Sequence, residues 1–153
     1  MRIHFTRLAA IAALGFATPA WAQSEGLIGV EQPWARASIM ASRPAAAYFT
    51  VVNRGDQADT LVGLESPIAD RAEVHQTIKQ DDVMKMAPAG PVEVPAGGEV
   101  RLEPGGLHVM LMELERPIRE GETIKLTLRF ANAPSLDVSV PVMGLGAKGP
   151  ENE

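Results

Sequence analysis

The chain of 153 residues suits a single domain with an ordinary core, since 46% of its residues are hydrophobic. It contains no cysteine, which excludes disulfides, thiol redox chemistry, thiolate zinc sites and blue-copper electron transfer. The net charge of −5 argues against nucleic acid and anionic lipid as partners. Any metal chemistry must therefore use histidine, methionine or carboxylate ligands.

The first 22 residues have the features of a secretory signal peptide. A basic start with two arginines precedes a short apolar run, and Ala20-Trp21-Ala22 forms a small-residue cleavage pattern. The run is too short for a membrane span, and no later stretch approaches the ~20 apolar residues that a span needs. We expect residues 1–22 to be removed on export to the periplasm. This segment contains two of the 14 basic side chains and none of the 19 acidic ones. The mature chain therefore has a formal net charge of −7.

Short apolar runs divided by Gly and Pro turns predict an all-β domain, because the intervals between turns are too short for βαβ units. We expect strands at residues 27–38, 46–53, 60–66, 72–79, 83–87, 92–94, 99–102, 107–114, 123–130 and 136–142. Such a series indicates a Greek-key β-sandwich or small barrel, in one domain spanning residues 23–143. Residues 144–153 have little apolar content and are predicted to form a flexible tail.

Two histidines remain once His4 leaves with the signal peptide, and both lie in expected strands close to methionines. Side chains alternate between the two faces of a strand, so His108 and Met110 project side by side, with Met112 on the same face. His75 lies in an earlier strand. The spacing therefore predicts imidazole and thioether groups near one strand end.

Methionines also follow His75, where Met84 and Met86 share one face of the next expected strand. Imidazoles and thioethers form a soft, neutral ligand set, which suits a monovalent soft ion better than Zn²⁺, Ca²⁺ or Mg²⁺. Cu(I) is the natural candidate. Thioethers bind without losing a proton, so binding should weaken only in acid, where imidazole is protonated.

A structural interpretation of the same residues competes with the metal site. A strand histidine is often a satisfied polar residue, and methionine is a common core filler. However, both remaining histidines and several methionines fall within residues 75–112. Composition alone does not predict this clustering, which favours a metal site.

The spacing of four residues resembles a known signature. His75, ten residues, Met86, twenty-one residues, His108, one residue and Met110 match the H-x10-M-x21-H-x-M motif of the PCuAC family of periplasmic copper chaperones. The resemblance implies a cupredoxin-like sandwich in which these four residues hold one Cu(I) per chain. It also implies transfer of the ion by ligand exchange to a copper-accepting protein, a cytochrome c oxidase subunit or its assembly factor, with no enzymatic activity.

The other methionines and the C-terminal residues bear on how many copper ions the chain binds. Met84 and Met112 become neighbours of the site that either shield the ion or pack, and we favour packing. Some relatives carry a His- and Met-rich extension that binds additional copper, whereas residues 144–153 contain neither residue. We therefore expect one site per monomeric chain and no independent capacity for Cu(II).

Two other functions stay open at this stage. A periplasmic copper-buffering or resistance protein would use the same site without a dedicated acceptor. A metal-free β-sandwich interaction module would tolerate leucine at Met86 and Met110, because the two side chains have similar volumes. A hydrolytic metalloenzyme is disfavoured, since two histidines without a suitable carboxylate make a poor catalytic zinc site.

Overall fold

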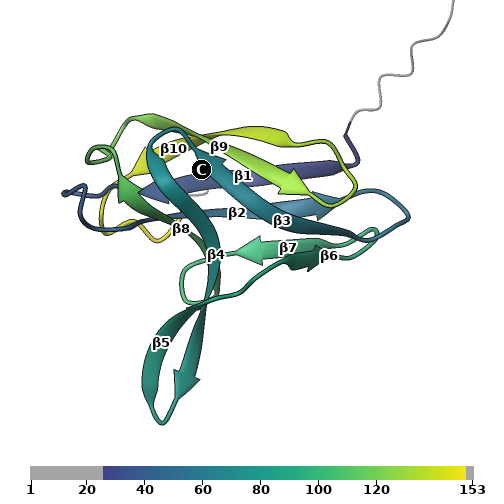
Figure 1. Ribbon diagram of the computed structural model, residues 1–153, viewed down its shortest axis with the longest axis horizontal. Coiled ribbons are helices and arrows are strands. Elements are labelled where there is room, and N and C mark those ends of the chain that lie inside the picture. Colours follow the sequence, from purple (N-terminus) through teal and green to yellow (C-terminus); the bar gives the residue numbers. More distant parts are fainter. Residues whose placement is uncertain (1–25, 151–153) are drawn as a thin grey trace, which may run out of the picture.

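The computed structural model describes residues 26–150, which form ten strands (Figure 1). Within these residues there is no helix of the length and apolarity needed to cross a membrane. The predicted signal peptide lies outside the described residues. The strands are β1 (Ile28–Arg36), β2 (Ala45–Asn53), β3 (Asp59–Ser66), β4 (Ala69–Gln80), β5 (Val83–Pro88), β6 (Val92–Val94), β7 (Glu99–Leu102), β8 (Leu107–Leu114), β9 (Thr123–Phe130) and β10 (Leu136–Met143).

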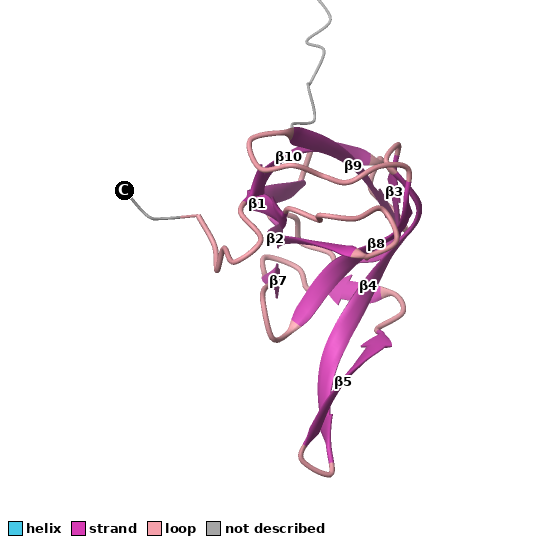
Figure 2. Ribbon diagram, turned by 90° about the vertical axis from the view of Figure 1, so that its left-hand side faces the viewer, coloured by secondary structure: helices cyan, strands magenta, loops and turns pink. Residues whose placement is uncertain are grey.

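Seven strands close into a flattened barrel in the order β4-β8-β2-β1-β10-β9-β3, and β3 pairs back with β4 (Figure 2). The β1–β10 pair is parallel, and the other pairs are antiparallel. β7 pairs with β2, and β6 pairs with β3. Neighbouring strands that lie far apart in sequence are typical of Greek-key connections. The predicted all-β fold class is confirmed.

Alternation along the strands fills the interior of the barrel. Alternate residues of β9 are buried, and Leu126 and Leu128 are fully covered. On β8, Val109 and Leu111 point inward and pack in the same core as Phe49. Each such side chain contributes roughly 1.5–3 kcal/mol by leaving water. Because the inward positions of β8 supply the packing, its outward positions are free to carry polar and soft groups.

The β4–β5 hairpin projects away from the barrel in both views (Figures 1 and 2). Asp81 and Asp82 join its strands with φ angles of 51° and 60°, and Gln80 pairs with Val83. Two positive φ angles in a two-residue loop define a type I′ turn, whose twist matches the flanking strands. This turn fixes which residues of β5 face which residues of β4.

Asp59 holds the loop that follows β9. Its carboxylate accepts hydrogen bonds from the backbone N–H groups of Thr60 (2.7 Å), Asn132 (3.0 Å) and Ala133 (2.8 Å). Burial opposes ionisation, but these hydrogen bonds outweigh it and hold the pKa of Asp59 below its usual value of 3.8. The charged form of Asp59 therefore stabilises the folded state.

We expect Asp59→Asn to lower the free energy of unfolding by about 1–3 kcal/mol at pH 7, because the donors lose a charged acceptor. The folded pKa is lowered, so the stabilisation is complete above the unfolded pKa of ~3.9 and is lost as pH falls through the folded value. Denaturant unfolding of wild type and variant from pH 7 down to about pH 2 tests this. Asp56→Asn, at an exposed position of the neighbouring loop, is the control. A deficit that persists undiminished in acid contradicts the assignment.

Candidate metal centre

The two histidines come from adjacent strands and lie together. His75 of β4 and His108 of β8 are direct cross-strand partners, and their ring centroids are 6.2 Å apart. Directly opposed residues of antiparallel strands present their side chains on the same face of the sheet. Since Val109 faces the core, both imidazoles lie on the outer face of the barrel wall.

His108 has one nitrogen satisfied and one without a partner. Its side chain is buried, with 3% exposure, and Nδ1 lies 3.0 Å from the carbonyl oxygen of Gly106. That acceptor assigns the ring proton to Nδ1 and leaves a lone pair on Nε2. Nε2 is buried and has no hydrogen-bond partner among residues 26–150. A buried polar atom without a hydrogen bond lowers the stability of the folded state by about 1–3 kcal/mol. A metal ion can bind the lone pair of Nε2.

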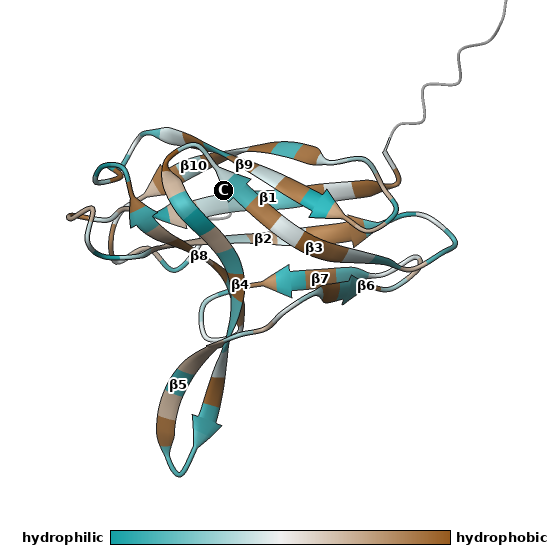
Figure 3. Cartoon of the chain, in the orientation of Figure 1, coloured by the Kyte–Doolittle hydropathy of each residue, from teal (hydrophilic) through white to brown (hydrophobic). Residues whose placement is uncertain are grey.

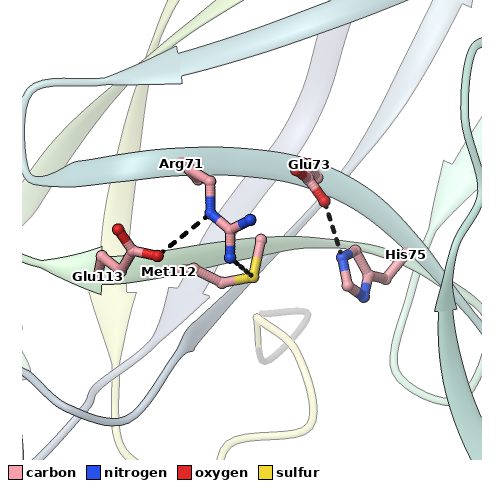
Figure 4. Close-up of polar contacts among 5 residues, drawn as sticks. All are labelled: Arg71, Glu73, His75, Met112 and Glu113. Carbon is pink, nitrogen blue, oxygen red and sulfur yellow. Dashed lines mark hydrogen bonds and ion pairs between the residues drawn. The ribbon is translucent and has the colours of Figure 1, made fainter.

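Glu73 accompanies His75 on the same face of β4. Its Oε2 lies 3.3 Å from Nε2 of His75, whose side chain is 13% exposed (Figure 4). A proton on Nε2 that donates to this carboxylate leaves Nδ1 of His75 as the free donor atom. Glu73 was not among the predicted site residues. Its position two residues before His75, on the same strand face, was the available signal.

The two predicted methionine ligands lie on either side of the histidine pair. Met110 pairs with Glu73 across β4 and is half-buried, whereas Met86 pairs with Thr77 across the hairpin and is 63% exposed. These pairings put both thioethers on the face that carries the histidines. The structure therefore brings all four predicted ligands to one outer face, spanning β5, β4 and β8.

A pocket of about 330 Å³ opens on this face, and Met86, His108 and Met110 line it. His75 lies beside His108 but is not part of the pocket lining. Arg36 is the single charged residue among the described residues that line this pocket, and none of these lining residues is a carboxylate. Coulomb repulsion from a guanidinium is twice as large for a divalent as for a monovalent ion. The Glu73 carboxylate, 3.3 Å from Nε2 of His75, opposes this repulsion, so the soft donors rather than the charges favour a monovalent ion.

Arg36 is held at the pocket by aromatic rings and by the C-terminal segment. Its guanidinium lies 5.7 Å from the ring centroid of Trp34 and 5.4 Å from that of Tyr48. Burial raises the pKa of Tyr48 above its usual value of 10, although Arg36 partly offsets this, so the phenol stays neutral. Arg36 Nε also donates to the carbonyl oxygen of Ala147 at 2.8 Å. The mobility of residues 144–153 stays a prediction.

The two remaining methionines differ from each other in their surroundings. Met112 is half-buried, and its Sδ accepts a hydrogen bond of 3.7 Å from Nη2 of Arg71 (Figure 4). Nε of the same arginine forms an ion pair with Glu113 at 3.3 Å. Met112 therefore packs against the barrel wall, as expected. The packing expected for Met84 is wrong, because its side chain is 61% exposed.

The fold and the His/Met cluster together define a cupredoxin-like β-sandwich of the PCuAC type. The chain belongs to the LpqE-like family, whose model, described as "Putative lipoprotein LpqE-like", matches residues 28–142. "Putative lipoprotein Lxx21020" of Leifsonia xyli subsp. xyli is 35% identical over 130 residues, which cover 81% of this chain and 76% of that protein.

Solved structures of PCuAC domains share the fold. The apo PmoF2 PCuAC domain superimposes with a TM-score of 0.67 at 29% identity, over 82% of this chain and 96% of that domain. A copper-bound PCuAC domain from PmoF2 gives a TM-score of 0.65 at 27% identity, over 78% and 94%. The CuI-DR1885 solution structure from Deinococcus radiodurans gives 0.55 at 34% identity, over 80% and 83%. The predicted resemblance to the PCuAC family is confirmed.

Proposed function

We propose that this protein is a periplasmic copper chaperone that binds one Cu(I) per chain through His75, Met86, His108 and Met110. The buried Nε2 of His108 carries the proposal, because a metal ion supplies the partner that no described residue provides. Two neutral imidazoles and two thioethers match a soft monovalent ion. Two similar structures, a copper-bound PCuAC domain from PmoF2 and CuI-DR1885, support the choice of copper.

The unequal burial of the donors supports delivery by ligand exchange. His108 is enclosed, whereas Met86 is 63% exposed, so an incoming donor can replace the methionine while the histidine retains the ion. The process changes no covalent bond of the protein and needs no catalytic group. One chain supplies all four donors, so a monomer suffices. The family description as a lipoprotein supports export, and the acceptor we propose is a cytochrome c oxidase subunit or its assembly factor.

A competition titration of residues 23–153 with Cu(I) against a chromogenic chelator, under anaerobic reducing conditions, tests the metal site. We expect a stoichiometry of one ion per chain and an affinity that exceeds those for Zn²⁺ and Cu(II), measured in parallel. Absence of Cu(I) binding would refute the proposal. Mixing the loaded protein with candidate acceptors then separates the functions, since a carrier hands the ion over quickly and a buffer retains it.

A further inference from the structure

The exposed Met84 lies in line with the proposed copper ligands. The Asp81-Asp82 turn sets the hairpin register so that Met84 pairs with Lys79 and Met86 pairs with Thr77. Positions two apart on a strand share a face, so Met84 lies on the same face as Met86, about 7 Å further from the barrel. Met84 is thus the outermost thioether on the face that carries His75.

Packing does not explain a methionine at this position. Met84 is 61% exposed, although a buried thioether side chain would contribute roughly 1.5–3 kcal/mol. The hairpin that carries it stands clear of the barrel, and hydrophobic and hydrophilic residues are interspersed along it (Figure 3). Met112 provides the contrast, because Arg71 holds its sulfur at the barrel wall. Of these two methionines, Met84 is the one whose sulfur is accessible to an ion or a partner.

We infer that Met84 is the ligand through which Cu(I) leaves the site, an inference that rests on the proposed function. The ion held by the histidines and Met110 gains a bond to Sδ of Met84 as its bond to the exposed Met86 breaks. The outermost thioether then presents the ion to the acceptor. Copper stays in the +1 state throughout, and thioethers are neutral, so no proton or electron moves. The role predicts a contribution to transfer rate and little contribution to equilibrium affinity.

Transfer kinetics of Met84→Leu test this inference. Protein loaded with one equivalent of Cu(I) is mixed anaerobically with a short two-cysteine peptide as the acceptor probe. We expect the variant to transfer copper about tenfold more slowly than wild type. Its Cu(I) affinity should change by less than about threefold. Met112→Leu is the matched control and should match wild type in both measurements.

Methyl NMR distinguishes contact with the ion from a purely structural role of Met84, because a structural role would leave its methyl resonance insensitive to Cu(I). In protein labelled at the methionine methyl groups, Cu(I) should shift or broaden the Met84 resonance and leave that of Met112 unchanged. Wild-type transfer by Met84→Leu, or an unresponsive Met84 methyl, would overturn the inference and leave the copper site intact. Failure of the wild type to bind Cu(I) would overturn both proposals, so the two failures are distinguishable.

Discussion

Replacing His108 with leucine should abolish tight Cu(I) binding and leave the domain folded. Nε2 of His108 is the one nitrogen of the proposed donor set that the fold buries without a hydrogen-bond partner among residues 26–150. Its ring orientation is fixed by the bond from Nδ1 to Gly106. We therefore expect the Cu(I) affinity to fall by at least about a thousandfold, which corresponds to ~4 kcal/mol.

The same substitution should cost little stability. The carbonyl of Gly106 loses the imidazole donor but still accepts a hydrogen bond from the backbone N–H of Thr77, at 3.3 Å. The variant also removes the buried, unpartnered Nε2, and such an atom costs about 1–3 kcal/mol. These changes offset each other. The apo variant should be as stable as wild type to within about 1 kcal/mol, or more stable.

Chelator competition and denaturant unfolding of the metal-free protein check the two halves of this prediction. Thr77→Val is the matched control, because Thr77 lies on the same face and lines the pocket without belonging to the donor set. The control should bind Cu(I) as wild type does. Unchanged affinity in the leucine variant would remove His108 from the site. A large loss of apo stability would show that the imidazole has a structural role.

The amino-acid sequence predicted the strands better than their partners. All ten expected strands are present, and their bounds differ by at most three residues, as at β4, which begins at Ala69. Alternation within β8 correctly put His108 and Met110 on one face, since that depends only on local geometry. The direct pairing of His75 with His108 joins strands that are not consecutive. Such a register depends on the whole sheet, so the sequence could not specify it.

Burial was the other property that local patterns could not supply. Alternation assigns a side chain to a face of a strand, but it does not say whether another layer covers that face. Met84 was expected to pack because methionine usually does, yet its strand belongs to a hairpin outside the barrel. Arg36 reaches the pocket because β1 lies beside β2 and because Ala147 accepts its Nε–H. These contacts arise only when the barrel closes.

Substituting leucine for both Met86 and Met110 should lower Cu(I) affinity by about a hundredfold or more, because two of the four soft donors are lost. The fold should be unaffected. Met86 is 63% exposed and contributes little to packing, and Met110 is half-buried, where a swap of similar volume usually costs less than about 1.5 kcal/mol. Chelator competition and thermal unfolding of the double variant measure both effects, with Met112→Leu as the control of equal chemistry.

The two sets of variants together distinguish the donor chemistries. If thioethers hold the ion, the double leucine variant loses Cu(I) affinity while His75 and His108 retain a weak two-imidazole site. That residual site no longer favours a soft ion, so the preference for Cu(I) over Zn²⁺ should shrink as well. A double variant that binds Cu(I) like wild type would exclude the methionines as ligands. Because a metal-free interaction module predicts no functional change in this variant, a loss of copper delivery with the fold intact would also exclude that alternative.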